Sequence, residues 1–96
     1  MIILDWDENK RRVNLARRKI DFADLDYFFA SETAKGVDDR FDYGEERFLT
    51  FGLFAGIVLA VVHTETDRGD DVIIRVISAR RANKNEQEYY FKNIRD

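Results

Sequence analysis

The sequence has no cysteine and a single histidine, His63. Without cysteine the chain can form neither a disulfide bond nor a thiolate metal site, and one imidazole cannot build a histidine cluster around a metal ion. We therefore expect the fold to depend on its hydrophobic core alone. We also expect no metal site and no cofactor.

Proline and long hydrophobic runs are absent too. The longest nearly apolar stretch runs from Phe48 to Val62 and is too short to cross a bilayer. It is also interrupted by Thr50, Gly52 and Gly56. The first residues lack the basic region of a signal peptide. No linker or repeat divides the 96 residues, so we expect one domain, residues 1–96, in the cytoplasm.

Acidic side chains slightly outnumber basic ones, and the formal net charge is −3. Its distribution is uneven: residues 1–21 carry +2 and residues 75–96 carry +3, whereas residues 22–50 carry −5 and residues 51–74 carry −3. A fold that brings the two ends of the chain together would present one basic face on an acidic body.

Hydrophobic periodicity divides the chain into helices and strands. Asp7 and Asp21 are suited to cap two successive helices, because their carboxylates can accept hydrogen bonds from first-turn N–H groups. The first part of the chain is expected to form a strand Ile2–Trp6, helices Glu8–Lys19 and Phe22–Phe29, a weak strand at 33–38 and a polar loop at 38–45. The second part is expected to form strands Glu46–Gly52, Ile57–Thr64 and Val72–Ala79, joined by turns at 54–56 and 64–71. A helix from Ala82 to Ile94 follows.

This order predicts an α+β fold: a short N-terminal strand, two helices packed on one face of an antiparallel meander sheet, and a C-terminal helix. The terminal helix contains Tyr89, Tyr90 and Phe91 in succession. Consecutive helical residues lie about 100° apart, so at least one of these aromatic side chains must be exposed.

Cations gather where the last strand meets the last helix. Arg75 lies within an apolar strand, and Arg80, Arg81 and Lys84 follow at the junction. Cations at the start of a helix are opposed by its dipole, whereas free N–H groups there attract anions. The segment therefore predicts a phosphate site, although each cation taken alone could equally be an ordinary solvated side chain.

Several segments, in this order along the chain, resemble the BrnT family. They are Trp6-Asp7 with Lys10 and Asn14, Ile20-x-Phe22, Gly44-Glu-Glu-Arg47, Val61-Val-His-Thr-Glu65, and Arg75-Val-Ile-Ser-Ala-Arg80-Arg-Ala-x-Lys84-x-Glu86. The resemblance implies the toxin of a BrnT–BrnA type II toxin–antitoxin pair, a small ribonuclease with a RelE-like fold. Its expected partners are a BrnA-like antitoxin and RNA, with DNA reached only indirectly through the antitoxin, and no membrane.

One turn departs from the family pattern. Where the family usually has Lys-His-Gly, this chain has Arg17-Arg18-Lys19. A glycine would take the left-handed conformation that ends a helix, so Lys19 must adopt it with strain or end the helix differently. Arg18 cannot replace a histidine in proton transfer, because its guanidinium stays protonated.

Metal-independent RNA cleavage needs a base, cations that stabilise the phosphorane, and an acid for the leaving oxygen. We expect Arg75 and Arg80 to stabilise charge and His63 and Glu46 to transfer protons. The RNA phosphates would contact Arg81, Lys84 and Lys10. The neutral alternatives are a strand-end histidine bonded to backbone for His63, a surface ion pair for Glu46 and a local hydrogen bond for Lys10.

Two other functions stay open at this stage. The chain could be a binding subunit that has lost catalysis and holds the antitoxin in a DNA-binding complex, an alternative favoured by the altered turn and the acidic net charge. A DNA-binding domain is less well supported, because no helix carries a consistently basic face.

Overall fold

The computed structural model describes residues 1–40, 42 and 44–94. Its elements, in chain order, are β1 (Ile2–Trp6), α1 (Glu8–Arg18), the 3₁₀ turn η1 (Phe22–Asp24), α2 (Asp26–Ala30), β2 (Thr33–Val37), β3 (Phe48–Phe54), β4 (Ile57–Arg68), β5 (Asp71–Arg81) and α3 (Lys84–Asn93). Among the described residues, no helix is long and apolar enough to cross a membrane. Phe41 and Tyr43, in the expected polar loop, lie outside the described residues.

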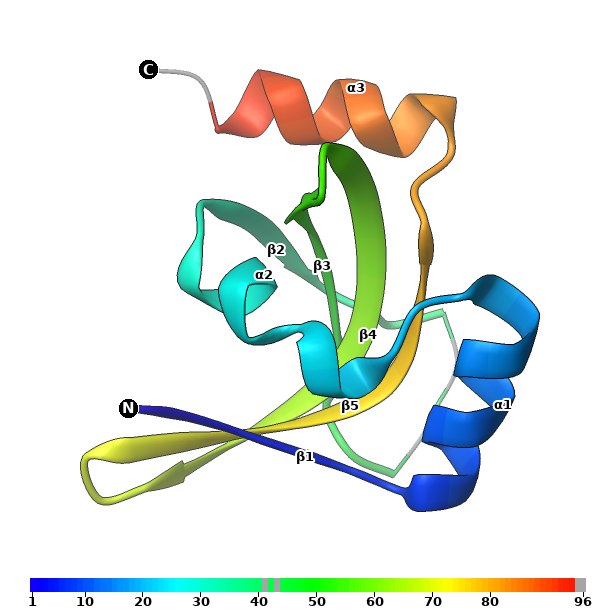
Figure 1. Ribbon diagram of the computed structural model, residues 1–96. Coiled ribbons are helices and arrows are strands. Elements are labelled where there is room, and N and C mark those ends of the chain that lie inside the picture. The colour runs from blue at the N-terminus through cyan, green and yellow to red at the C-terminus, as the bar shows by residue number, and fades with distance from the viewer. Residues whose placement is uncertain (41, 43, 95–96) are drawn as a thin grey trace.

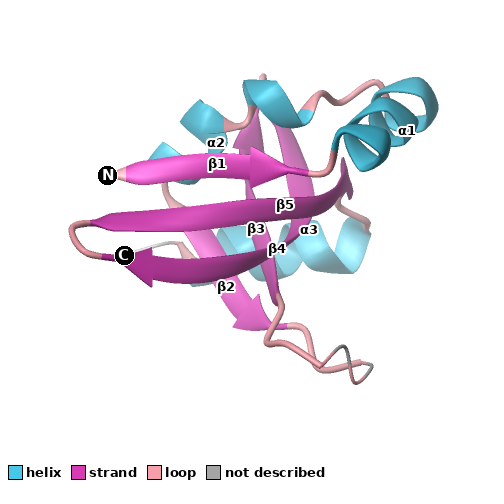
Figure 2. Cartoon of the chain, turned by 90° about the horizontal axis from the view of Figure 1, so that it is seen from below, coloured by secondary structure: helices cyan, strands magenta, loops and turns pink. Residues whose placement is uncertain are grey.

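The strands form one sheet in the order β1-β5-β4-β3-β2 (Figures 1 and 2). The strands from β2 to β5 form the expected antiparallel meander. β1 pairs with β5 in parallel, so the sheet is mixed. The α+β prediction is confirmed, and the parallel edge strand is an addition that the sequence order did not reveal.

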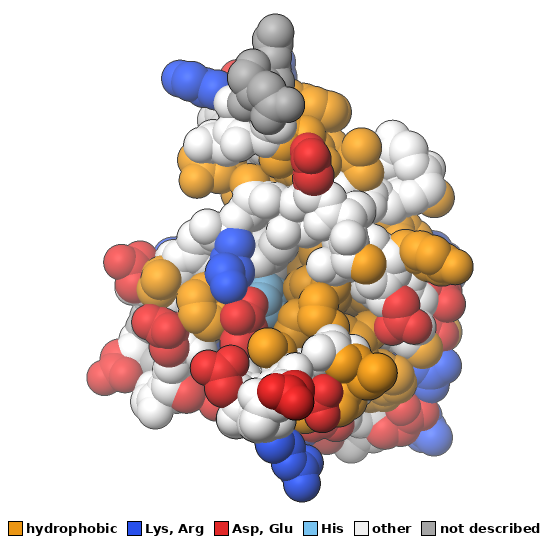
Figure 3. Space-filling model, turned by 90° about the vertical axis from the view of Figure 1, so that its left-hand side faces the viewer, with side chains coloured by type: hydrophobic (Ala, Val, Ile, Leu, Met, Phe, Trp, Pro, Cys, Tyr) orange, Lys and Arg blue, Asp and Glu red, His pale blue; other side chains and the backbone are white. Residues whose placement is uncertain are grey.

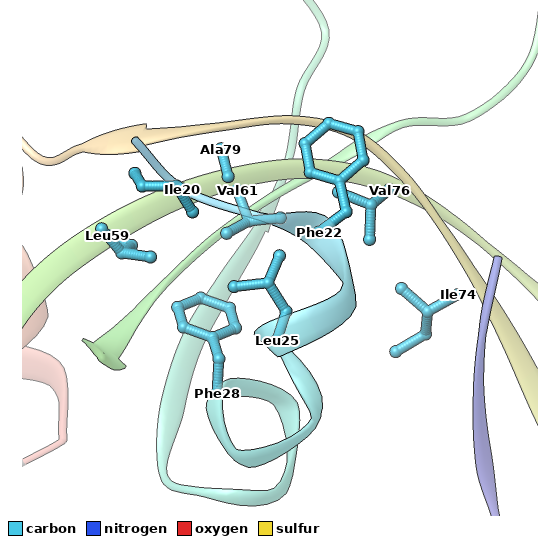
Figure 4. Close-up of a cluster of buried hydrophobic side chains, with 9 residues drawn as sticks. All are labelled: Ile20, Phe22, Leu25, Phe28, Leu59, Val61, Ile74, Val76 and Ala79. Carbon is cyan, nitrogen blue, oxygen red and sulfur yellow. The ribbon is translucent and has the colours of Figure 1, made fainter. Parts of the chain in front are cut away.

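The two faces of the sheet are covered by different helices. We call the side beneath η1 and α2 the α2 face, and the side beneath α3 the α3 face. The α2 face carries the larger core, in which Phe22, Leu25 and Phe28 are completely buried (Figure 4). Each such side chain stabilises the fold by about 1.5–3 kcal/mol. The rest of this core consists of Ile20, Leu59, Val61, Ile74, Val76 and Ala79.

A smaller core fixes α3 to the other face. Tyr90, only 2% exposed, packs there with Phe51 and Ala60 of the sheet, and its hydroxyl donates to the carbonyl of Glu32. Tyr89 and Phe91 on either side are each 47% exposed. The expectation that the aromatic triplet cannot be wholly buried is therefore confirmed.

The N-terminal caps of the first two helical segments lie where the sequence predicts them. The Asp7 carboxylate accepts from the Lys10 backbone N–H at 3.0 Å, and that of Asp21 accepts from Ala23 N–H at 3.0 Å. α1 ends at Arg18, and the C-cap residue Lys19 adopts the left-handed conformation with a φ of 62°. A residue with a Cβ thus occupies a position that glycine fills at lower cost.

Several predicted boundaries differ from the structure: β3 begins at Phe48 rather than Glu46, and α3 begins at Lys84 rather than Ala82. Two other differences are larger. The expected helix Phe22–Phe29 is divided into η1 and α2 at Leu25. A 3₁₀ turn repeats every three residues, which directs residues 22, 25 and 28 toward the same side. The expected turn at 64–71 is mostly strand, because β4 and β5 continue pairing as far as Arg68 and Asp71.

Candidate functional site

Arg75 and Arg80 lie on the same side of the sheet, the α3 face. Arg80 pairs with Ala60 of the core beneath α3, and Arg75 pairs with Thr64, which is four residues further along β4. The two arginines are five positions apart, so in a regular strand they would point to opposite faces. A bulge in β5 prevents this, since Val62 pairs with Ser78 and His63 pairs with Val76, which leaves the intervening residue unopposed.

Arg80 is held by Glu86, a residue of the first turn of α3. The two guanidinium nitrogens donate to the two carboxylate oxygens at 2.7 and 2.8 Å. This hydrogen bonding lowers the pKa of Glu86 and raises that of Arg80. Glu86 also accepts from the Asn83 backbone N–H, while the Asn83 side chain accepts from Glu86 N–H, which completes a capping box.

This arrangement changes the expected anion site at the strand-to-helix junction. A first-turn N–H is already bonded to Asn83, and Arg80 is already bonded to a carboxylate. Arg75 is similarly engaged: its guanidinium lies 2.6 Å from the carboxylate of Asp5, its direct neighbour on parallel strand β1. A phosphate that binds either arginine must compete with an existing carboxylate.

A hollow of about 330 Å³ adjoins the Arg80–Glu86 pair. Its apolar residues are Val37, Leu49 and Phe51, from β2 and β3, and Tyr89 of α3 forms an aromatic wall. The Phe51 and Tyr89 rings meet edge to face with centroids 5.7 Å apart. The polar rim consists of Asn83, Asn85 and Glu86. An apolar floor with amide groups at its rim is suited to a flat polar ring such as a nucleobase.

His63 lies on the opposite side, the α2 face, and has no exposed surface. Its Nε2 is 2.7 Å from the hydroxyl oxygen of Thr50, and its ring lies against Phe29 and Phe48. Burial lowers its pKa, and the nearby Glu65 carboxylate opposes this effect. Figure 3 shows the pale blue histidine at the bottom of a hollow.

The structure therefore does not bring His63 together with Arg75. The two residues are on neighbouring strands, but His63 pairs with Val76 and Arg75 pairs with Thr64. Adjacent positions on a strand point to opposite faces, so the one-residue offset puts the sheet between the two side chains. The sequence could not fix the pairing register, and the register of the fold puts His63 and Arg75 on opposite faces of the sheet.

The remaining predicted residues are dispersed. Lys84 is exposed and begins α3, between Asn83 and Asn85, which line the hollow, but it does not line the hollow itself. Glu46 is exposed, two residues before β3. Arg81 lines a different hollow beside Gly56 and Phe91, and Lys10 faces a third hollow next to α1. Within the described residues, no group of three or more His, Cys, Asp or Glu side chains is placed to hold a metal ion.

Sequence reasoning missed the importance of Glu86. The signal was present, because Asn83 and Glu86 have the spacing of a capping box at the start of a helix. The tertiary fold was needed to show that the same carboxylate binds Arg80.

Comparison with known proteins identifies the family. Residues 6–86 match the model of a family described as the ribonuclease toxin, BrnT, of type II toxin–antitoxin systems. The crystal structure of the ribonuclease toxin BrnT from Brucella abortus is similar, with 36% sequence identity and a TM-score of 0.60, over 88% of this chain and 99% of that chain. No functionally curated protein matches significantly. This chain belongs to the BrnT family of ribonuclease toxins from type II toxin–antitoxin systems.

Proposed function

We propose that this chain is a metal-independent endoribonuclease that cleaves RNA by attack of the substrate's own 2′-hydroxyl, and that a BrnA-like antitoxin neutralises it in the cytoplasm. The observation that carries the proposal is the hollow on the α3 face, one of whose lining residues, Glu86, binds Arg80. A base would lie against Phe51 and Tyr89. The adjoining phosphate would then reach the guanidinium of Arg80.

The arginines supply the electrostatic part of the reaction. Charge accumulates on the phosphorane oxygens as the 2′-hydroxyl attacks, and a forked guanidinium can bind two of those oxygens at once. In this proposal Arg80 stabilises the phosphorane, Arg75 binds a more distant phosphate along the same face, and Lys84 adds a positive charge at the start of α3. Arg81 and Lys10, on other surfaces, would contact the substrate only beyond the scissile phosphate.

Proton transfer falls to Glu46 rather than His63. Glu46 is an exposed carboxylate in the segment leading to β3, whereas His63 has no exposed surface and lies across the sheet from Arg80. Glu86 is closer to Arg80, but its lowered pKa makes it a weak base. We assign Glu86 the role of positioning Arg80.

The first test is cleavage by the purified chain in EDTA. We expect RNA fragments that end in a 2′,3′-cyclic phosphate or a 3′-phosphate, because the attacking oxygen belongs to the substrate. Arg80→Gln should reduce kcat/KM by about 100-fold or more, as expected for loss of a group that stabilises transition-state charge. Cleavage that requires Mg²⁺, or that is indifferent to the loss of both Arg75 and Arg80, would contradict the proposal.

Glu86→Gln is the matched control. Glutamine can replace glutamate in a capping box, so this variant keeps the start of α3 and removes only the charge that engages Arg80. We expect it to fold and to bind RNA at least as tightly as the parent. The double variant, with both residues changed to Gln, should be as inactive as Arg80→Gln, although it leaves no half-buried carboxylate without its partner.

A second function is favoured by one observation: both Arg75 and Arg80 are already paired with carboxylates. In this alternative the chain is a catalytically weakened subunit that mainly holds the antitoxin in a DNA-binding complex. Expression of the chain alone in bacteria separates the two functions. Growth arrest that is relieved by the neighbouring gene product supports the toxin, and harmless accumulation supports the binding subunit.

A further inference from the structure

The outer edge of β5 is covered by two different elements along its length. β1 pairs with β5 only between Val72 and Val76. Beyond that point α1 follows β1 and lies along the same edge (Figure 2). A hollow of about 500 Å³ remains between α1 and β5, lined by Lys10, Val13, Arg17, Arg18, Ile77 and Ser78, together with Asp7, Asn9 and Asn14. We call this hollow the α1 groove.

Asn14 fixes the floor of the α1 groove. This side chain is only 7% exposed, although it belongs to a helix that is otherwise polar and exposed. Its amide group donates to the Ile20 carbonyl at 3.0 Å, and its amide oxygen accepts from the Ala79 backbone N–H at 3.0 Å. The bond to Ala79 joins α1 to the free edge of β5, so the groove is formed before any ligand arrives.

The two sides of α1 use their cations differently. Arg11 bonds to Glu8 and Asp21, and Arg12 lies 3.6 Å from Glu8. Lys10, Arg17 and Arg18 face the groove instead, and in the described part of the chain no carboxylate lies within ion-pair distance of them.

The helix dipole accounts for only part of this cation set. It favours Arg17 and Arg18 in the last turn of α1, but it opposes Lys10 in the first turn. The groove also contains one carboxylate, that of Asp7, and it caps the helix by accepting from Lys10 N–H. Three positive charges thus face one negative charge in a chain whose net charge is −3.

We propose that the α1 groove binds the phosphate backbone of single-stranded RNA, on one side of the cleavage site. Lys10 and Arg17 are seven residues apart, roughly 10 Å along the helix axis. This distance is larger than a phosphate group, so the two side chains would contact different phosphates of the same strand. The apolar side chains of Val13 and Ile77 offer contacts to ribose and bases. The inference rests on the proposed function in one respect, since that function supplies the RNA.

An acidic peptide is the main competing ligand. An extended peptide would normally bind a free strand edge by continuing the sheet. Here Asn14 already occupies the Ala79 N–H, so a peptide strand cannot take that hydrogen bond. An RNA strand needs no backbone pairing and requires only cations at intervals, which the groove provides.

The test uses a labelled oligoribonucleotide in which every ribose is 2′-O-methylated, so that it binds but cannot be cleaved. Its affinity for the full chain is measured by fluorescence anisotropy at several salt concentrations. The groove variant is Lys10→Gln with Arg17→Gln and Arg18→Gln. The control variant is Arg12→Gln with Arg68→Gln and Lys92→Gln, which loses the same charge at exposed positions elsewhere.

We expect the groove variant to bind about tenfold more weakly than the parent, and its salt slope to fall by about 2, as loss of three contacts to a single strand predicts. The control variant should change by less than about threefold. Circular dichroism checks that both variants fold. Equal weakening of the two variants would overturn the proposal, because net charge rather than the groove would then decide binding.

A labelled oligoglutamate peptide of equal charge shows whether the groove prefers RNA or binds any polyanion. If the groove variant loses affinity for the peptide as strongly as for RNA, the groove is a general anion or peptide site and the RNA proposal is wrong. The measurement does not depend on catalysis. An inactive parent that still binds RNA through the groove would refute the proposed enzyme and leave this inference standing.

Discussion

At the scale of single residues, His63 shows how far environment can outweigh residue type. An imidazole with an ordinary pKa near 6.5 is suited to proton transfer, and it was an obvious candidate in a chain with only one histidine. The structure gives it no exposed surface and a hydroxyl partner in Thr50. His63 is therefore better explained as a buried polar group that joins β4 to β3.

The stability of the fold should depend on the protonation of His63. Burial lowers its pKa in the folded state, so the unfolded chain takes up a proton more readily. Stability should then be constant above pH 6.5 and should fall as the pH decreases below 6.5 toward the folded pKa, by at most about 1.4 kcal/mol per pH unit. Urea unfolding between pH 5 and pH 8 measures this dependence.

His63→Gln is the control for this pH dependence. Glutamine can still bond to Thr50 but does not titrate, so the variant should lose the slope between pH 5 and pH 6.5. Asp21 and Glu86 also have lowered pKa values, but their ordinary values of 3.8 and 4.5 place their contributions at lower pH. An unchanged slope in His63→Gln would show that other groups cause it.

At the scale of elements, the strands were predicted better in type than in length. β4 and β5 run to Arg68 and Asp71, through a segment whose Thr, Glu and Asp residues are typical of a turn. Long hairpin arms tolerate such residues because backbone pairing with the neighbouring strand, rather than local preference, holds them extended. The caps at Asp7 and Asp21 could be predicted because capping involves residues only two or three positions apart.

The contact between α2 and β3 gives a prediction at this scale. Gly52 of β3 faces α2, and a Cβ there would lie 2.8 Å from a ring carbon of Phe28 and 3.0 Å from the methyl carbon of Thr33. Gly52→Ala must displace a fully buried ring and should lower the free energy of unfolding by about 1–3 kcal/mol. Thermal or urea unfolding followed by circular dichroism measures the effect.

Gly36→Ala is the matched control, since nothing lies within 4 Å of a Cβ at that position of β2. We expect its stability to stay within about 0.5 kcal/mol of the parent. If both variants were equally stable, α2 would be free to move away from β3.

At the scale of the whole molecule, one sheet serves two cores. The larger core packs beneath η1 and α2, and the smaller one packs beneath α3 on the opposite face. Because β4 contributes buried residues to both cores, they should not unfold independently. The two surfaces that we assign to RNA lie on different parts of the molecule: the hollow next to the Arg80–Glu86 pair is on the α3 face, and the α1 groove is at the edge of β5.

A pair of core variants tests this coupling. Leu25→Ala in the larger core should cost about 2–5 kcal/mol, and Tyr90→Ala in the smaller core about 3–5 kcal/mol. In each variant, Trp6 fluorescence and far-ultraviolet circular dichroism should report one shared midpoint. A Tyr90→Ala protein in which the circular dichroism midpoint falls while the Trp6 midpoint is unchanged would show that α3 unfolds separately.

The sequence by itself determined the features that depend on near neighbours: the periodicity of the helices and strands, the caps at Asp7 and Asp21, and the motifs by which the chain resembles its family. Tertiary structure alone decided which side chains share a face. A bulge in β5 put Arg75 and Arg80 on the same face of the sheet, and a one-residue offset put His63 on the opposite face. Side chains alternate along a strand, so register decides which of them meet, and register is set by packing between residues far apart in the sequence.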